Sequence, residues 1–216
     1  MKELGIKYDN DKVTEHRYDL IYPIFLEKFK NIGIKMLEIG LGTFSDGTGY
    51  SRDMWKEYLI NPTIFVMDIG HEFKDELGEV IKGDQSNIND LIHVAKVCGE
   101  LDFIIDDGSH HPEHQIMSFD YLFTNNLKFG GTYIIEDIEC SYWRNDAEVY
   151  GYKTGYLHII DFFQKLLHQI NSQFSQQTNK YQISSITFSK NTIIITKQTE
   201  EEVEINKKQY RFIDNL

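Results

Sequence analysis

Short apolar runs and segments with helical spacing alternate along residues 34–137 of the chain. Between the runs, apolar residues recur three and four positions apart, as at Met54, Trp55, Tyr58 and Leu59, which is the spacing of one helix face. Parallel strands need crossover connections of this kind. The alternation therefore predicts an α/β fold in which helices cover both faces of a parallel sheet. The runs that we expect to form its strands are Ile34–Gly40, Thr63–Asp68, Val80–Asp84, Leu101–Ile105 and Thr132–Asp137.

The C-terminal part of the chain has a different pattern. Apolar residues from Tyr156 to Ile170 recur at helical spacing, and two strand-like runs, Tyr181–Phe188 and Thr192–Thr196, flank a short polar turn. The two runs predict an antiparallel hairpin. A mostly parallel sheet closed by such a hairpin, with seven strands in all, is the Rossmann-like sandwich of the class I methyltransferases. The acidic run Glu200–Glu204 is expected to be a solvated tail.

The N-terminal part is expected to cover this core. Residues 1–13 are polar and predict a loop. A helix is expected to follow, with Thr14 as its N-cap and Pro23 at a kink or in the first turn. We expect one methyltransferase domain over residues 1–216, with an N-terminal helical lid or cap over 1–33, a cofactor and metal core over 34–145, and a C-terminal helix and hairpin over 146–216. The apolar residues of the expected N-terminal helix are Leu20, Ile21, Ile24, Phe25 and Phe29.

The composition narrows the class of partner. The chain has 216 residues and a formal net charge of -12, which repels nucleic acid and anionic membrane surfaces and points to a small-molecule substrate. No apolar run is long enough to cross a membrane, and the start lacks a signal-peptide core, so we expect a cytoplasmic protein. Assembly into a homo-oligomer stays open. Cys98 and Cys140 form no Cys-x-x-Cys pair and are expected to be reduced thiols.

A glycine turn after the first expected strand indicates a cofactor site. Ligands of open α/β sheets bind beyond the carboxyl ends of the strands, and Gly40 and Gly42 allow a close approach to the backbone. Position 45 is serine, so the dinucleotide fingerprint is incomplete, which counts against a dehydrogenase. With Glu38 before the turn and Asp68 at the end of the next strand, the pattern resembles S-adenosylmethionine binding, in which Asp68 would hold the ribose hydroxyls.

The segment after the third expected strand extends this site. Gly83-Asp84-Gln85 falls where the third strand of this fold meets the adenine, and Asp84 can accept a hydrogen bond from an exocyclic amine while Gln85 offers amide groups. Asp84 can equally be an acid at a helix N-terminus that interacts with the helix dipole. We therefore predict cofactor contacts from both residues, with the structural alternative open for Asp84.

Acids and histidines follow the fourth and fifth expected strands. The segments Asp106-Asp-Gly-Ser-His110, Gly131–Asp137 and Ser141-Tyr-Trp143 resemble the metal-dependent sugar O-methyltransferases that act on macrolide antibiotics such as mycinamicin and tylosin. The match is weaker at Asp11-Lys12, His16 and Tyr18 and covers roughly residues 8 to 145. The resemblance implies that Asp107, Glu136 and Asp137 hold Mg²⁺ and that His110 is the general base.

The chemistry of these residues agrees with the roles that the resemblance implies. Three carboxylates at the ends of neighbouring strands repel one another unless a cation bridges them, and a set of oxygen ligands suits Mg²⁺ better than zinc. The ion would bind vicinal sugar hydroxyls and lower the pKa of one of them, and His110 could remove its proton near neutral pH. We expect an acceptor such as a nucleotide-activated hexose or heptose for a surface polysaccharide, or a glycosylated metabolite.

Several alternatives stay open at this edge. Because neighbouring strand residues face opposite ways, Asp106 is expected either near the cofactor or in a structural bond. His110, His111 and His114 could form a zinc cluster, although Pro112 interrupts their helical spacing. Tyr142 and Trp143 could stack on a sugar ring or simply be buried in a loop.

Two other functions share this fold and cofactor. A phenol or other small-molecule O-methyltransferase would differ only in its acceptor, and the Asp-Gly-Ser-His segment favours the sugar enzymes. A non-catalytic protein that senses S-adenosylmethionine would lack the acids or the histidine, and this chain has all of them.

Overall fold

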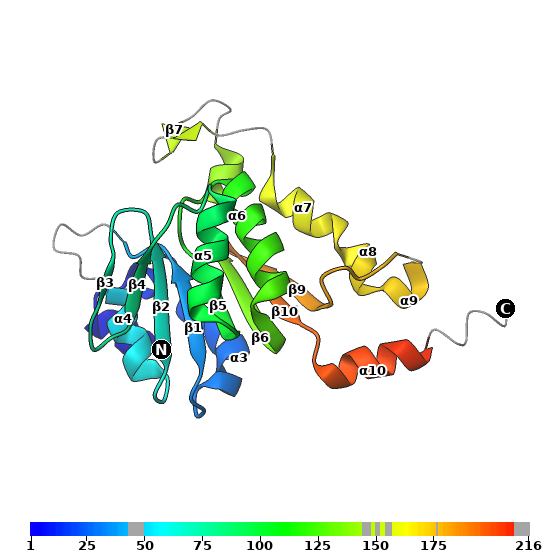
Figure 1. Ribbon diagram of the computed structural model, residues 1–216, viewed down its shortest axis with the longest axis horizontal. Helices are drawn as coiled ribbons and strands as arrows, with labels where there is room; N and C mark the ends of the chain where they lie inside the picture. Colours follow the sequence, from blue (N-terminus) through cyan, green and yellow to red (C-terminus); the bar gives the residue numbers. More distant parts are fainter. Residues whose placement is uncertain (43–49, 144–147, 150–151, 154–156, 176, 210–216) are drawn as a thin grey trace.

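A computed structural model describes residues 1–42, 50–143, 148–149, 152–153, 157–175 and 177–209. Its centre is an eight-stranded sheet with the strand order β3-β4-β2-β1-β5-β6-β10-β9 (Figure 1). The strands that follow the expected runs are β1 (Lys35–Ile39), β2 (Thr63–Asp68), β4 (Glu79–Lys82), β5 (Leu101–Asp106), β6 (Leu127–Glu136), β9 (Ile183–Ser189) and β10 (Thr192–Lys197).

The pairing of these strands confirms the predicted fold class. The four neighbouring pairs from β4 to β6 are parallel, and β10 pairs antiparallel with both β6 and β9. The strand count is eight instead of seven because β3 (Phe73–Lys74) adds two residues antiparallel to β4. A separate two-stranded sheet is formed by β7 (Glu148–Val149) and β8 (Tyr152–Lys153).

Strand β1 lies at the switch point of the sheet, because the chain adds β2 and β4 on one side of it and β5 and β6 on the other. It pairs with β2 on one side and with β5 on the other. Its alternating side chains serve two cores, since Leu37 and Ile39 belong to one apolar cluster and Met36 to the other. The carboxyl end of β1 is therefore the position at which a ligand site is expected in an open α/β sheet.

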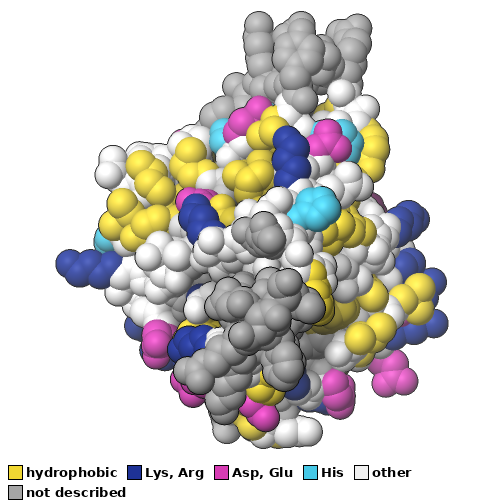
Figure 2. All heavy atoms as spheres, turned by 90° about the vertical axis from the view of Figure 1, so that its right-hand side faces the viewer, with side chains coloured by type: hydrophobic (Ala, Val, Ile, Leu, Met, Phe, Trp, Pro, Cys, Tyr) yellow, Lys and Arg dark blue, Asp and Glu magenta, His cyan; other side chains and the backbone are white. Residues whose placement is uncertain are grey.

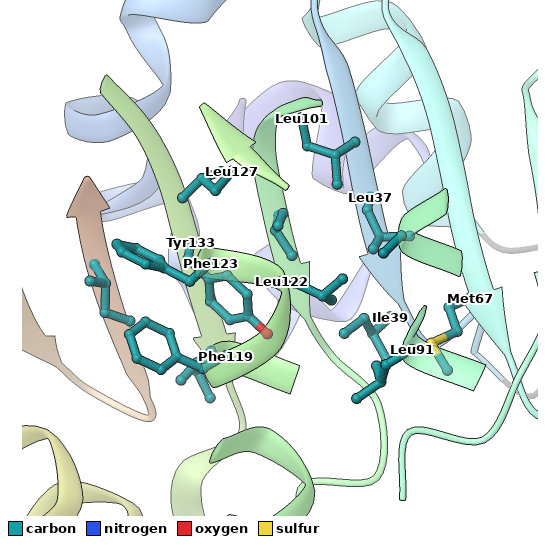
Figure 3. Close-up of a cluster of buried hydrophobic side chains, with 14 of the residues drawn as sticks. Leu37, Ile39, Met67, Leu91, Leu101, Phe119, Leu122, Phe123, Leu127 and Tyr133 are labelled. Atoms are coloured by element: carbon teal, nitrogen blue, oxygen red, sulfur yellow. The ribbon is translucent and has the colours of Figure 1, made fainter. Parts of the chain in front are cut away.

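The helices divide between the two faces of the sheet. On one face lie α5 (Ile88–Cys98), α6 (Pro112–Ser118), the π-helical turn η3 (Phe119–Phe123) and α7 (Ile159–Lys165). Figure 3 shows this core, in which Phe119, Leu122 and Phe123 point towards strand residues such as Leu37 and Tyr133. The other face is covered by α4 (Tyr50–Tyr58) and the N-terminal segment, which pack Trp55, Tyr18 and Tyr22 against the sheet.

The N-terminal segment differs from the prediction. Residues 1–13 contain helices α1 (Lys2–Lys7) and α2 (Asp11–Thr14) instead of a loop. Thr14 ends α2 rather than capping a helix, and Asn10 is the N-cap, since its side chain accepts the N–H of Lys12 at 3.1 Å. The expected single helix is broken into η1 (Tyr18–Leu20), α3 (Tyr22–Leu26) and η2 (Glu27–Phe29), and Pro23 lies in the first turn of α3.

The C-terminal helices also differ from the prediction. The expected long helix is broken into α7, α8 (Leu167–Ile170) and α9 (Ser172–Ser175), and Tyr156 lies outside the described residues. The acidic run Glu200–Glu204 begins helix α10 (Glu200–Gln209), and Glu200, Glu201 and Glu204 are exposed, as expected of a solvated run. A capping box explains this helix start: Thr199 N–H donates to Glu202 Oε2 at 2.7 Å, and Glu202 N–H donates to Thr199 Oγ1 at 3.1 Å.

The surface beside α9 and α10 is mixed in character. Figure 2 shows apolar side chains next to both acidic and basic ones on this side of the molecule. Exposed apolar residues in these elements and in β9 include Phe174, Phe188 and Ile205. Within the described part of the chain, no helix has the length and apolar character needed to cross a membrane.

Candidate functional site

The loop after β1 passes very close to the end of β5. Gly40 has a φ of 95°, and a Cβ atom there would lie 2.1 Å from the carbonyl oxygen of Asp107. Gly42 has a φ of 81°, and no atom of the described residues beyond Gly42 and its chain neighbours lies within 4 Å of a Cβ atom built there. Both conformations favour glycine, and at Gly40 the close approach requires it. The turn therefore leaves room for a ligand at the carboxyl ends of β1 and β5.

A cavity of about 350 Å³ lies over these strand ends. Most of the predicted cofactor residues line it, and they come from the loops after β1, β2, β4 and β5, which are distant in sequence. Its lining includes Gly40, Gly42, Asp68, Asp84, Gln85, Asp107 and Ser109. The structure thus brings together the two glycines, Asp68 and the Asp84-Gln85 pair, as the sequence predicted.

Asp68 is held in a defined position at the end of β2. Its carboxylate accepts the N–H of Leu41 at 3.2 Å and the N–H of Gly70 at 2.8 Å, and Oδ1 lies 2.8 Å from Nδ1 of His71. Bonds to both loops orient the carboxylate at the cavity wall. This placement suits a carboxylate that receives hydroxyl donors from a ligand.

Gln85 and Asp106 form a buried pair beneath the cavity. The amide nitrogen of Gln85 donates to both carboxylate oxygens of Asp106 at 2.7 and 2.8 Å, and its oxygen accepts the N–H of Ser109 at 2.9 Å. Asp106 is fully buried and also accepts from the hydroxyl of Tyr133 at 3.3 Å. Of the two alternatives for Asp106, this geometry favours the structural bond, through which Asp106 orients Gln85.

Both interpretations of Asp84, as a cofactor contact and as a structural acid before a helix, stay open. It lines the cavity, and its Oδ1 also accepts the N–H of Ser86 at 2.8 Å and the hydroxyl of Ser86 at 2.7 Å. The two hydrogen bonds from Ser86 organise the turn that leads into α5. Contact with a cofactor therefore stays a prediction for Asp84.

A second group of carboxylates surrounds a buried lysine. The ammonium of Lys12 lies 2.5 Å from Asp107 Oδ2, 2.8 Å from Glu136 Oε2 and 3.3 Å from Glu38 Oε1. Burial by itself lowers the pKa of the Lys12 ammonium, but the three carboxylates more than offset this and hold that pKa well above its ordinary value. Glu38, predicted to contact the cofactor, is buried here and also accepts from Ser51 Oγ at 2.8 Å.

Two tyrosines from the N-terminal segment complete this group. Tyr22 donates its hydroxyl to Glu136 Oε1 at 2.5 Å, and Tyr18 donates to Asp137 Oδ1 at 2.8 Å. The two rings stack with centroids 5.1 Å apart. Lys12, Tyr18 and Tyr22 were not among the predicted site residues, although the weaker match at Asp11-Lys12, His16 and Tyr18 was the sequence signal for Lys12 and Tyr18.

Asp107, His110 and Asp137 form a group that could hold a metal ion. Each offers a ligand atom, and these atoms lie within 4.8 Å of one another. His110 and Asp137 have φ values of 58° and 51°, a left-handed conformation that is uncommon outside glycine and is often found at functional sites. These turns bring the side chains towards one point beyond the ends of β5 and β6.

The donor set of this group fits a divalent cation. Burial raises the pKa of Asp137, and the charge of Asp107 raises it further, so a bound cation would relieve the repulsion between the two carboxylates. The two carboxylates of the group suit Mg²⁺ or Mn²⁺. Glu136, the third predicted ligand, is directed instead towards Lys12 and Tyr22, and its role as a ligand stays a prediction.

The other histidines of the segment have different surroundings. Nδ1 of His114 lies 2.8 Å from Ser109 Oγ, and the His114 ring stacks on that of buried His111 with centroids 5.1 Å apart. In the part of the chain that the structure describes, the metal-capable group contains neither of them. The arrangement does not favour the alternative of a zinc cluster made of three histidines.

The predicted aromatic platform lies on the surface. Tyr142 is 66% exposed and Trp143 is 45% exposed, so loop burial is not their environment. The Tyr142 ring meets that of His158 edge-on, with centroids 4.6 Å apart. Contact of either ring with a sugar stays a prediction.

Comparison with known proteins shows what this chain is similar to. It is 33% identical over 144 residues to 8-demethyl-8-alpha-L-rhamnosyl tetracenomycin-C 2'-O-methyltransferase of Streptomyces olivaceus, a match that covers 65% of this chain and 38% of that protein. It is 34% identical over 148 residues to mycinamicin VI 2''-O-methyltransferase of Micromonospora griseorubida, which covers 66% of this chain and 37% of that protein. No family model matches the chain.

A solved structure extends the similarity over nearly the whole chain. The methyltransferase MycE of mycinamycin biosynthesis, in complex with Mg, SAH and mycinamycin VI, superimposes with a TM-score of 0.78 at 26% identity. The match covers 93% of this chain and 54% of MycE. The chain thus spans well under half the length of the relatives matched by sequence and about half of MycE. The homologues of this chain are sugar O-methyltransferases that act on glycosylated antibiotics, and the chain shares their class I methyltransferase fold.

Proposed function

We propose that this chain is an S-adenosylmethionine- and Mg²⁺-dependent O-methyltransferase that methylates a sugar hydroxyl of a glycosylated small molecule. One observation carries the proposal: Asp107 lines the cofactor cavity and also belongs to the metal-capable group with His110 and Asp137. A cofactor in the cavity and an acceptor at that group would therefore meet beside Asp107. MycE, which has this fold, binds Mg and SAH.

The cavity would take the cofactor with its adenosine end over β2 and β4. Asp68 would accept the ribose hydroxyls, and Asp84 and Gln85 would lie beside the adenine. Gly40 and Gly42 would allow the remainder of the molecule to lie against the backbone of the β1 loop. Two buried acids would hold residues of this site in place. Glu38 pairs with Lys12, and Asp106 accepts from the amide of Gln85.

Asp107 and Asp137 would hold the ion, with Glu136 as the third ligand predicted from the sequence. When bound, a divalent ion of this kind lowers the pKa of a coordinated hydroxyl and fixes its orientation. His110 would accept the proton of the acceptor hydroxyl. Tyr18 and Asn191 orient the Asp137 carboxylate, to which they donate at 2.8 Å each. Tyr142 and Trp143, exposed beyond β6, would contact the sugar.

The acceptor class follows from the relatives and from charge. The relatives are named for rhamnosyl tetracenomycin, macrocin and mycinamicin substrates, and none of these names supports a nucleotide-activated sugar or a surface polysaccharide. The formal net charge of -12 disfavours a polyanionic acceptor. We therefore propose a neutral or cationic glycoside as the acceptor.

Methyl transfer from labelled S-adenosylmethionine tests this function. The acceptor panel would contain a rhamnosylated tetracenomycin-type glycoside, a macrolide glycoside, a nucleotide-activated hexose and a catechol, each with Mg²⁺ or with a chelator. Transfer to a glycoside that chelation abolishes and Mg²⁺ restores supports the proposal. Transfer to the catechol alone, or transfer that survives both chelation and Asp137→Asn, contradicts it.

A further inference from the structure

A second cavity lies beside the cofactor cavity. It has a volume of about 340 Å³ and is formed largely by the N-terminal segment, which the sequence led us to expect only as a lid. The residues that line both cavities are Asp11, Gly40, Leu41, Gly42 and Asp107. The two cavities therefore meet over the β1 loop, and α2 forms the wall at that junction.

Two carboxylates face this junction, and of the two only Asp107 forms a salt bridge among the described residues. Asp107 is paired with the ammonium of Lys12 at 2.5 Å. Asp11 is exposed, and its Oδ1 accepts the backbone N–H of Lys12 at 2.8 Å. Among the described residues, no lysine, arginine or histidine forms a salt bridge with Asp11. Asp11 is thus the carboxylate at the junction that can receive a cation from a ligand.

The position of Asp11 is fixed by its neighbour. The side chain of Lys12 points inward, where it is 2% exposed and pairs with Glu38 of β1, Glu136 of β6 and Asp107, which follows β5. The side chain of Asn10 caps the same turn. These contacts anchor α2 on the sheet and hold Asp11 at the edge of the cavity without burying it.

The chemistry of the proposed cofactor matches this geometry. S-adenosylmethionine carries adenosine at one end and an amino acid with a positively charged α-ammonium group at the other. With adenosine beside Asp68, Asp84 and Gln85, the amino acid end would extend along Gly40 and Gly42 towards the junction. A charged ammonium there requires an acceptor, and a charge-assisted hydrogen bond to a carboxylate is stronger than a neutral one.

We propose that Asp11 receives the α-ammonium group of the cofactor and that Lys12 is the positioning residue that holds Asp11 in place. This inference rests on the proposed function and adds to it a role for the N-terminal segment. It makes that segment a wall of the cofactor site, so that the N-terminal segment and the loops after the strands would contact one ligand.

Two related ligands distinguish the loss of a contact with the α-ammonium group from a general loss of cofactor binding. S-adenosylhomocysteine contains the amino acid part, whereas 5'-methylthioadenosine has the same thioadenosine without it. Their dissociation constants would be measured by calorimetry for the wild type, Asp11→Asn, and the matched control Asp9→Asn, since Asp9 lines only the second cavity. Asp68→Asn serves as the control that acts on the ribose, which both ligands share.

We expect Asp11→Asn to weaken S-adenosylhomocysteine about tenfold or more and to leave methylthioadenosine within about twofold of the wild type. Asp9→Asn should change neither, and Asp68→Asn should weaken both. An equal loss for both ligands in Asp11→Asn, or no loss for either, overturns the role of Asp11 and leaves the proposed function standing. A folded wild-type chain that binds neither ligand overturns the proposed function and this inference with it.

Discussion

The ammonium of Lys12 lies 2.8 Å from Oε2 of Glu136, although 124 residues separate them in the chain. The same ammonium pairs with Glu38 on β1 and Asp107 after β5. One N-terminal lysine thus forms ion pairs with acids from β1, from β6 and from the loop after β5. Because these acids surround the proposed site, the N-terminal segment belongs to the site and does not merely cover it.

Lys12→Met should strongly destabilise the fold. The substitution leaves Glu38 and Glu136 buried without a counter-ion, and breaking a buried ion pair costs about 3 to 5 kcal/mol. Urea unfolding followed by circular dichroism measures the change in the free energy of unfolding. The matched control is Lys7→Met, which removes an ion pair with Glu57 between exposed side chains and should change the stability little. Equal effects of the two substitutions would contradict the structural role of Lys12.

Gly40→Ala and Gly42→Ala should differ sharply. Both glycines have positive φ values, but only at Gly40 would the added Cβ meet the carbonyl of Asp107. We expect Gly40→Ala to lower the free energy of unfolding by about 3 kcal/mol or more and to abolish binding of S-adenosylhomocysteine. Gly42→Ala should cost about 1 to 2 kcal/mol, the strain of a left-handed alanine. Thermal or urea unfolding of both variants measures the difference, and similar losses would contradict the close contact of the two loops.

The metal-capable group should bind Mn²⁺ in place of Mg²⁺. Electron paramagnetic resonance of free Mn²⁺ gives the affinity without any turnover. Asp107→Asn and Asp137→Asn should each weaken Mn²⁺ binding about tenfold or more, because each removes a charged ligand. Asp120→Asn, a change in an exposed acid that pairs with Lys180 far from the site, is the control and should have no effect. Retention of full affinity in Asp137→Asn would contradict the site.

The central strands were predictable because β2, β5 and the second half of β6 are mainly apolar runs. Buried parallel strands have this composition, and the observed bounds of β2, Thr63–Asp68, coincide with the expected run. The strand β3 escaped prediction because Phe73–Lys74 has only two residues and no apolar pattern. The breaks between the helices α7, α8 and α9 were missed because apolar spacing alone does not show where a helix ends.

The site was predictable where chemistry-bearing residues follow strands directly. The cavity is lined by Gly40, Asp68 and Asp107, each of which ends or directly follows a strand that the sequence predicted. Lys12 was missed because a lysine in a polar stretch is expected in solvent, and its burial depends on acids more than 20 residues away. The contact of Asp106 with Gln85 was missed for a similar reason. It forms only when the loop after β4 packs against the end of β5.

Cys98 and Cys140 should react slowly with iodoacetamide in the folded protein. Burial raises the pKa of each thiol to about 12, so little of the reactive thiolate is present at pH 8. In urea both thiols should return to their ordinary pKa and react quickly. Mass spectrometry of the alkylated protein counts the modified thiols, and rapid modification of either cysteine under native conditions would contradict its buried environment.

The central claim is that the cavity over β1, β2 and β4 binds S-adenosylmethionine. Calorimetric titration of the folded chain with S-adenosylhomocysteine tests it most directly. We expect one saturable site per chain, weakened by Asp68→Asn because the carboxylate would hold the ribose hydroxyls. A folded chain that shows no saturable binding, or binding that Asp68→Asn leaves unchanged, would contradict the claim.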